Sequence, residues 1–353
     1  MNDARKWILY GATGYTGRLV AQEAKRQGLS PILAGRSDEV AALAAGLGLP
    51  SLVFSLSNVA ATRRALDGVS VVAHCAGPFS ATSAPMIDAC LLARANYVDI
   101  TGEIDVFLAA QRRHDEAQAA GIVVCPGVGF DVIPTDCVAA CLVEALPDAT
   151  HLALAFKGAG ARSPGTARTS IEGMRAGARV RKDGAIVGES LGQRTRIINF
   201  GSGPKLAVAI PWGDVATAYF TTGIANIEVY VPASPRAIAR LRRLERMRPL
   251  LRLAPVRAFA SRMAARNNPG PSQKQRDSEK TLVWGEACNE NGDTRTARLT
   301  TSNGYRLTVD GVLMSVRALL ARPAGAGGYF TPTQLLGARC VERLPGCSSI
   351  AIE

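Results

Sequence analysis

The sequence predicts an α/β protein whose first domain is a doubly wound parallel sheet. A second, α+β domain built on an antiparallel sheet is expected to follow. Short apolar runs alternate with helix-like runs through residues 1–125, the first apolar run ends in three glycines, and hairpin-like segments follow Pro134. Continuous apolar strands that alternate with helices are typical of a parallel sheet covered on both faces.

The alternation gives the elements of the first domain in order. Strands are expected at 6–11, 31–35, 51–56, 69–77, 97–100 and 121–127. Helices are expected at 15–27, 37–47, 58–66, 84–95 and 104–120. Because crossovers between parallel strands are right-handed, these elements wind into one sheet with helices on both faces.

The rhythm changes after Pro134, where a helix over 134–146 is followed by a strand over 151–158 and a helix over 166–180. Dipeptides that favour tight hairpin turns come next, between segments of alternating polarity. The expected turns are Asp183-Gly184, Asn291-Gly292 and Asn303-Gly304. This part of the chain therefore predicts antiparallel sheet.

Length and composition agree with two globular domains. Of the 353 residues, 47% are hydrophobic and 20% are charged, as in folded proteins. We expect the first domain over 1–133 and the second over 134–329, with a C-terminal helix at about 330–353 that returns to the first. No apolar stretch approaches the roughly 20 residues of a membrane span. Because the N-terminus also lacks a signal-peptide pattern, a cytoplasmic location is expected.

The eight cysteines are scattered, mostly in apolar runs. Cys137 and Cys141 share a helix face, but no second pair of ligands follows them, and no CxxC pair occurs. Free thiols in a reducing compartment are therefore expected, and no metal site.

The three glycines fall where the first strand ends and the first helix begins, which is the context of a dinucleotide-binding turn. One permits the tight turn, one lets the backbone approach a pyrophosphate, and one lets the helix pack on the strand. The helix N-terminus adds amide donors for the phosphate. The spacing GxxGxxG departs from the strict GxGxxG, so a ligand-free glycine turn stays open as the alternative. The predicted residues of this turn are Gly11, Thr13, Gly14, Tyr15, Thr16 and Gly17.

Arg36 distinguishes between the two nicotinamide cofactors. An NAD site has a carboxylate after the second strand, which accepts from the ribose 2′-hydroxyl. Here that strand ends with Gly35, Arg36 and Ser37. A guanidinium can pair bidentately with a 2′-phosphate. We therefore predict NADP(H), with Arg36 and Ser37 in the site. The alternative is a solvated surface arginine.

The fourth and fifth strands end at the same predicted edge. The fourth gives "HCAGPFS" (74–80) and the fifth gives "YVDITGE" (97–103). His74 lies inside an apolar run and is expected in the core. Thr101 could instead cap the next helix, with Glu103 in its first turn. The residues predicted to line the cofactor here are Ala76, Gly77, Pro78, Asp99 and Thr101.

Motifs along nearly the whole chain resemble the saccharopine dehydrogenase-like reductases, most strongly the bacterial trans-acting enoyl reductases. The matching motifs are "GATGYTG", "LAGR", "HCAGPFS", "YVDITGE", "PGVGFDVIPTD", "LVWGEA", "GYRLT" and "YFTPTQLLGA". The resemblance implies a Rossmann NADP(H) domain, an α+β domain that carries the substrate cleft, and hydride transfer as the chemistry. Characterised relatives reduce double bonds in polyketide-type lipid precursors.

Two segments depart from this pattern. Ser55 stands where such relatives commonly have Asp near the adenine. The segment 158–170 matches loosely the helix start expected near the substrate. It carries Arg162 and Arg168, which are candidates for an acidic substrate or a phosphopantetheine phosphate, or plain surface arginines.

Residues 235–267 form a basic segment with ten arginines and one acid, Glu245. Its apolar residues recur at helical spacing, and Pro249 and Pro255 divide it. Three roles remain open: an anionic membrane surface with peripheral binding, an acidic acyl-carrier protein, or a solvated helix face. Nucleic acid is not expected, because the segment has one aromatic residue and no binding module.

Together these features predict an NADPH-dependent reductase of an apolar acyl or polyketide-derived intermediate, free or carrier-linked, acting on a C=C bond. The alternatives are an imine or carbonyl reductase of a small metabolite and a non-catalytic NADP-sensing protein. Asp131 and Tyr329 are the candidate proton donors, with a helix cap and core packing as their other interpretations. A homodimer is left open.

Overall fold

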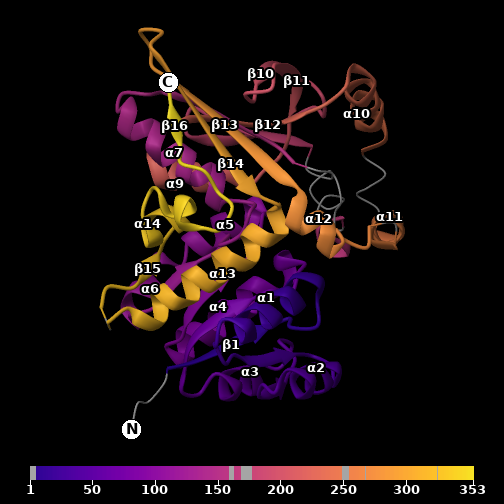
Figure 1. The fold of residues 1–353 in the computed structure, drawn as a ribbon, viewed down its shortest axis with the longest axis vertical. Coiled ribbons are helices and arrows are strands. Elements are labelled where there is room, and N and C mark those ends of the chain that lie inside the picture. The colour runs from indigo at the N-terminus through magenta and orange to yellow at the C-terminus, as the bar shows by residue number, and fades with distance from the viewer. Residues whose placement is uncertain (1–4, 159–162, 168–176, 249–253, 267, 324) are drawn as a thin grey trace. The chain divides into compact units, whose positions relative to one another are not determined.

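The computed structural model describes residues 5–158, 163–167, 177–248, 254–266, 268–323 and 325–353 (Figure 1). Contacts divide the chain into two compact units. The first consists of Met1–Thr101, Asp105–Phe130 and Leu307–Leu336. The second consists of Gly102–Ile104, Asp131–Arg306 and Gly337–Glu353.

The first unit is built on a seven-stranded sheet in the order β15-β6-β5-β4-β1-β2-β3, with every pair of neighbours parallel. This confirms the predicted doubly wound sheet. Because β2 and β3 lie on one side of β1 and β4 on the other, the strand order reverses at β1. The strands are β1 (Lys6–Tyr10), β2 (Ile32–Gly35), β3 (Ser51–Val53), β4 (Val69–His74), β5 (Asn96–Asp99), β6 (Val123–Cys125) and β15 (Gly328–Tyr329).

Helices follow the strands of the first unit as the sequence predicts, with two differences. The expected helix over 104–120 is divided into α5 and α6, and α4 begins at Phe79, five residues before the expected 84. Pro85 lies inside α4, at its seventh residue, where the missing amide removes one hydrogen bond of the helix. The helices are α1 (Tyr15–Arg26), α2 (Glu39–Leu47), α3 (Val59–Ala65), α4 (Phe79–Ala93), α5 (Ile104–Gln111), α6 (His114–Ala120), α13 (Gly304–Ala321), which belongs to this unit from Leu307 onward, and α14 (Pro332–Leu336).

The second unit is built on a nine-stranded mixed sheet. Most neighbours are antiparallel, as predicted, but β7 and β12 pair in parallel. Helices α7 (Ile133–Ala145) and α9 (Asp214–Thr222) pack on it, and a cluster with Trp284 and Tyr230 forms part of its core. The strands are β7 (His151–Lys157), β8 (Ala178–Lys182), β9 (Ala185–Glu189), β10 (Thr195–Asn199), β11 (Pro204–Ala209), β12 (Asn226–Pro232), β13 (Lys280–Cys288), β14 (Thr294–Ser302) and β16 (Ala351–Ile352).

Two predictions about the second half of the chain are corrected and two are confirmed. Asn303-Gly304 is not a hairpin turn, because α13 (Gly304–Ala321) begins there. The expected helix over 166–180 ends too late, since β8 begins at Ala178; its residues 168–176 lie outside the described residues. The turns at Asp183-Gly184 and Asn291-Gly292 are confirmed, joining β8 to β9 and β13 to β14.

The C-terminal segment differs most from its prediction. A helix over about 330–353 was expected to return to the first domain. Instead the first unit receives Leu307–Leu336, and β15 extends its sheet beside β6. Residues 337–353 belong to the second unit, where η2 (Cys340–Arg343) is a short 3-10 helix and β16 pairs with β14.

All eight cysteines are free thiols, as predicted. The closest pair is Cys137 and Cys340, whose Sγ atoms lie 3.4 Å apart in the second unit. Among the described residues, no cluster of His, Cys, Asp or Glu has the arrangement of a metal site. No helix in the described part of the chain combines the length and the apolar composition needed to cross a bilayer.

Candidate cofactor-binding site

The glycine turn is held in place by backbone contacts that leave no room for side chains. Gly11 has a φ of +84° and its amide donates to Ala34 O on β2 at 2.8 Å. A Cβ on Gly17 would lie 2.2 Å from Gly11 O, and one on Gly11 would lie 2.7 Å from Ala76 N. Only glycine therefore allows α1 to begin this close to the end of β1.

The N-terminus of α1 is open to an anion. The N-cap is Gly14, which is exposed and has an extended backbone. Among the described residues, no side chain forms a capping hydrogen bond at this position. The first turn of α1 contains no acidic residue. Thr13, Tyr15 and Thr16 are half-buried around the turn. Helix amides and the helix dipole thus face the position predicted for a pyrophosphate.

Arg36 lies at the same edge of the sheet, one residue past the end of β2. It is exposed, as is Ser37. Within the described part of the chain no carboxylate forms an ion pair with Arg36. Since Ala34 O accepts hydrogen bonds from both Gly11 and Ala12, the strand that carries Arg36 is tied directly to the glycine turn. The guanidinium is therefore available to a 2′-phosphate bound beside that turn.

Two exposed apolar residues, at the end of β3 and at the start of α3, were missed by the sequence analysis. Val53 pairs with Gly35 at the end of β3, and Val59 begins α3. Their side chains are 42% and 58% exposed. Val53, which pairs with the residue before Arg36, suits the face of an adenine ring, and Ser55 lies between the two valines in the chain. The sequence signal that could have identified this position is an apolar side chain at the carboxyl end of β3.

His74, at the end of β4, is a core residue, as predicted. It is fully buried, and its ring lies 5.5 Å from that of Tyr10 and 5.3 Å from that of Phe79. Burial lowers the pKa of His74 to about 3, so the imidazole stays neutral. Ala76, Gly77 and Pro78 follow it, and Gly77 is exposed. Thr82 Oγ1 donates to Ala76 O at 2.7 Å and so fixes this loop to α4.

Asp99 and Thr101 have a different role from the one predicted. Both are buried, at 1% and 0% exposure, so neither side chain offers a surface to a cofactor. The Asp99 carboxylate accepts from Tyr97 Oη at 2.7 Å and from the amides of Thr101 and Gly127 at 2.9 Å each. Burial raises the pKa of Asp99 to about 6, against the effect of these donors. Asp99 therefore shapes the site by holding the loops that follow β5 and β6 together.

The two candidate proton donors lie in different units. Tyr329, on β15 of the first unit, is buried, and its amide donates to His114 Nδ1 at 3.2 Å. Asp131, in the second unit, does not cap α7, whose N-cap is Val132. Burial raises the pKa of Asp131 to about 7, so both of its protonation states are populated near neutral pH. The carboxylate packs on Gly102, where a Cβ would lie 2.6 Å from Oδ2.

The first unit fits a phosphorylated dinucleotide on its own geometry. Gly14 is exposed, the N-terminus of α1 has no side-chain cap, and the Arg36 cation lies at the neighbouring strand end. The family comparison agrees, since residues 7–125 match the family described as the saccharopine dehydrogenase NADP binding domain. This match covers about a third of the chain.

Several curated proteins match the NADP-binding domain. A human protein named saccharopine dehydrogenase-like oxidoreductase is 30% identical over 150 residues, which cover 36% of this chain and 35% of that protein. A trans-acting enoyl reductase of Mycobacterium leprae is 32% identical over 139 residues, which cover 36% of this chain and 33% of its own. The chain therefore spans about a third of the length of these relatives.

The likeness to a solved structure extends beyond the NADP-binding domain. Apo saccharopine dehydrogenase (L-Glu forming) from Saccharomyces cerevisiae superposes with a TM-score of 0.65 over 99% of both chains, at 13% identity. At that identity the likeness concerns the fold alone. It extends to the second unit, so a parallel-sheet domain followed by a mixed-sheet domain is a shared architecture.

Proposed function

We propose that this chain is an NADPH-dependent reductase that reduces a C=C bond of an apolar acyl or polyketide-derived intermediate. The observation that carries the proposal is the fit of the glycine turn and Arg36 to NADP(H). A relative of the same NADP-binding domain is named a trans-acting enoyl reductase. The motifs that resemble this group continue beyond residue 125, which supports the same activity for the whole chain.

Each part of the NADP-binding domain has a task in such a reaction. When bound, NADPH supplies a hydride to one carbon of the double bond. The α1 amides hold the pyrophosphate, Arg36 pairs with the 2′-phosphate, and the Asp99 network keeps the loops after β5 and β6 in place. The protein contributes binding and orientation, and it must also deliver one proton to the other carbon.

Asp131 is our candidate for that proton transfer. A carboxyl whose pKa is about 7 is partly protonated at neutral pH and can donate. An ordinary aspartate, with a pKa near 4, would be almost entirely ionised there. Tyr329 is the second candidate. Its buried position agrees as well with core packing.

The acceptor distinguishes this proposal from its alternatives. Purified protein is mixed with NADPH and either an α,β-unsaturated acyl thioester or a 2-keto acid with an amine, and loss of absorbance at the NADPH band is followed. Oxidation with the enoyl thioester alone is expected. Oxidation with the keto acid and amine alone would favour a saccharopine dehydrogenase-like reaction on a small metabolite.

Binding without turnover would support the NADP-sensing alternative. Affinity for NADPH is therefore measured separately, by fluorescence titration, on the same preparation. If neither acceptor is reduced although NADPH binds tightly, the enzyme assignment fails while the cofactor assignment stands.

A further inference from the structure

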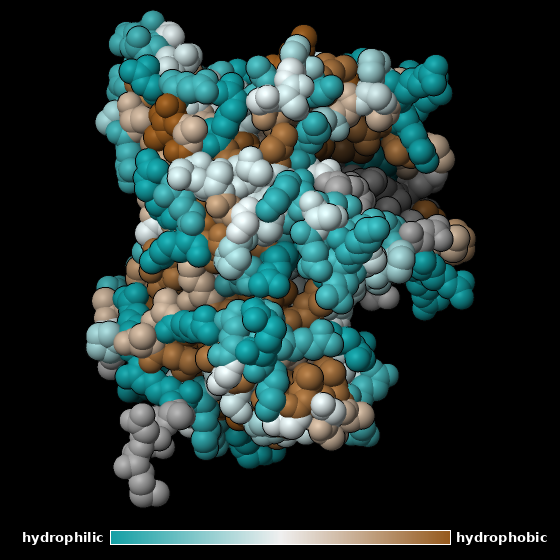
Figure 2. Space-filling model, in the orientation of Figure 1, coloured by the Kyte–Doolittle hydropathy of each residue, from teal (hydrophilic) through white to brown (hydrophobic). Residues whose placement is uncertain are grey.

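The basic segment folds into two helices of the second unit, α10 (Pro235–Met247) and α11 (Ala254–Arg266). Ser234 caps α10 by accepting from the Ala237 amide at 3.2 Å. Figure 2 shows hydrophilic side chains over α10, and both hydrophilic and hydrophobic ones over α11. The two helices differ in what they expose.

The inner face of α10 is anchored to the loop between β9 and β10. Ile238 is buried, at 4% exposure. Arg242 Nε donates to Gly192 O at 2.9 Å, and the Leu191 amide donates to Glu245 Oε2 at 3.1 Å. Gly192 has a φ of +75°, and a Cβ there would lie 3.2 Å from Ile238 O. This face of the helix is therefore fixed against the protein.

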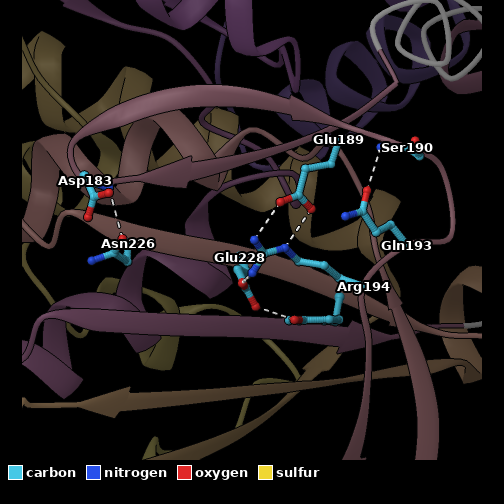
Figure 3. Close-up of polar contacts among 8 residues, drawn as sticks. Asp183, Glu189, Ser190, Gln193, Arg194, Asn226 and Glu228 are labelled. Atoms are coloured by element: carbon cyan, nitrogen blue, oxygen red, sulfur yellow. Dashed lines mark hydrogen bonds and ion pairs between the residues drawn. The ribbon is translucent and has the colours of Figure 1, made fainter.

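The loop itself is held by a network of ion pairs (Figure 3). Arg194 donates twice to the Glu189 carboxylate, at 2.6 Å each, and also pairs with Glu228 on β12. The Ser190 amide donates to Gln193 Oε1 at 3.2 Å across the loop. The loop that holds α10 is thus linked to both β9 and β12. The orientation of α10, and with it the direction of its outer face, is therefore defined.

The outer face of α10 is cationic. Arg236, Arg240 and Arg243 recur at helical spacing on one stripe and are all exposed. The one acid, Glu245, is neutralised by Arg248 at 2.8 Å. Met247 continues the stripe at the end of the helix and is 58% exposed. A positive field therefore faces outward without a competing carboxylate on the helix.

Helix α11 carries an apolar stripe. Val256, Phe259 and Met263 lie at i, i+3 and i+7 and thus on one face of the helix. Their exposures are 39%, 68% and 41%. Arg262 and Arg266 are exposed on the same helix. Large apolar side chains next to arginines on an exposed helix are typical of segments that lie in a membrane interface.

We propose that α10 and α11 bind an anionic lipid surface, with the arginines on phosphate headgroups and the α11 stripe inserted among the acyl chains. The positive charge of this segment favours an acidic partner, because the chain carries a net charge of +12 and the segment has ten arginines. An acidic protein would satisfy the charges alone. The exposed Phe259 and Met263 favour hydrocarbon, where each gains free energy by leaving water.

Vesicle co-sedimentation at low salt tests this inference. Vesicles are made of phosphatidylcholine alone or with phosphatidylglycerol, and binding to the second kind only is expected. Arg240→Glu with Arg243→Glu should weaken that binding at least about 30-fold, since each cation near an anionic surface contributes about 1 kcal/mol. Phe259→Ser with Met263→Ser should weaken it about 10-fold or more.

Matched substitutions in the same unit serve as controls. Lys182→Glu with Arg295→Glu makes the same change of charge at exposed sites, and Ile197→Ser removes a side chain that is 70% exposed. Both should bind vesicles like the parent, and every variant should keep its affinity for NADPH. Failure of the parent to bind anionic vesicles would overturn the proposal. So would binding that the Phe259 and Met263 substitutions leave unchanged, which would favour an acidic protein partner.

Discussion

The two sheets of this protein place chemistry in different ways. In the first sheet every strand is parallel, so all carboxyl ends meet at one edge, and the loops there carry the glycine turn, Arg36 and the Asp99 network. In the second sheet β7 and β12 are parallel but their other neighbours run antiparallel, and strand ends of both kinds share each edge. Neither edge of the second sheet therefore collects the carboxyl ends of all its strands.

The difference shows what a parallel sheet contributes to function. At its carboxyl edge the backbone positions the cofactor, through helix amides and glycines. Asp131, the proton donor that we propose in the second unit, depends on its environment instead, since burial raises its pKa to about 7. The following predictions test these two modes, starting with the largest expected effect on cofactor binding or turnover.

Gly17→Ala tests whether the first edge is built by backbone contact. The added Cβ would lie 2.2 Å from Gly11 O, and the turn cannot yield without moving α1. We expect at least about 100-fold weaker NADPH binding by titration, equivalent to about 2.7 kcal/mol. Gly46→Ala is the control, because that glycine lies in α2 with nothing within 4 Å, and it should bind normally. Unchanged affinity in Gly17→Ala would refute the backbone model.

Asp131→Asn tests the chemical contribution of the second unit. Removal of a general acid should lower the turnover rate about 100-fold, without changing NADPH affinity. In the parent, the rate should fall as the pH rises through about 7, because only the protonated carboxyl donates. A rate that is flat between pH 6 and pH 8 would argue against Asp131 as the donor.

The same substitution has an effect on stability whose sign follows from linkage. The pKa of Asp131 is higher in the folded chain than its ordinary value of 3.8, so folding favours the protonated form. Stability from this group is complete at low pH and is lost as the pH rises from about 4 to about 7. Asp131→Asn should therefore be more stable than the parent at pH 8, by up to about 4 kcal/mol, and similar at pH 4. Thermal unfolding at both pH values, with exposed Asp67→Asn as control, measures the difference.

Arg36→Ala tests the side-chain part of the first edge. Loss of a charge-assisted pair with the 2′-phosphate should weaken NADPH binding about 10- to 30-fold and leave NADH binding nearly unchanged. The ratio of the two affinities, measured by titration in the parent and in the variant, reports the effect. A parent protein that prefers NADH would refute the assignment of Arg36.

Gly285→Ala should have the smallest effect on the cofactor site. This glycine lies in β13, and a Cβ there would lie 2.5 Å from Val138 Cγ1 and 2.9 Å from Leu142 Cδ1, both side-chain atoms of α7. Side chains can repack, so we expect a loss of about 1–3 kcal/mol in thermal unfolding and no change in NADPH affinity. A loss of NADPH binding here would mean that the second sheet shapes the cofactor site, against the comparison above.

The sequence by itself determined the parallel sheet, the glycine turn and the cationic end of β2. Each depends on residues close together in the chain: apolar runs of strand length, glycines at fixed spacing, and an arginine directly after a strand. Such signals are local because backbone sterics and strand polarity act between near neighbours.

Tertiary structure alone decided the rest. The return of Leu307–Leu336 to the first unit depends on pairing between β15 and β6, about 200 residues apart in the chain. The exposure of Phe259, the burial of Asp99 and the raised pKa of Asp131 depend on what else packs against these side chains. The burial of a side chain depends on the residues that pack against it in the fold, so the sequence neighbours of a carboxylate or a phenylalanine do not determine it.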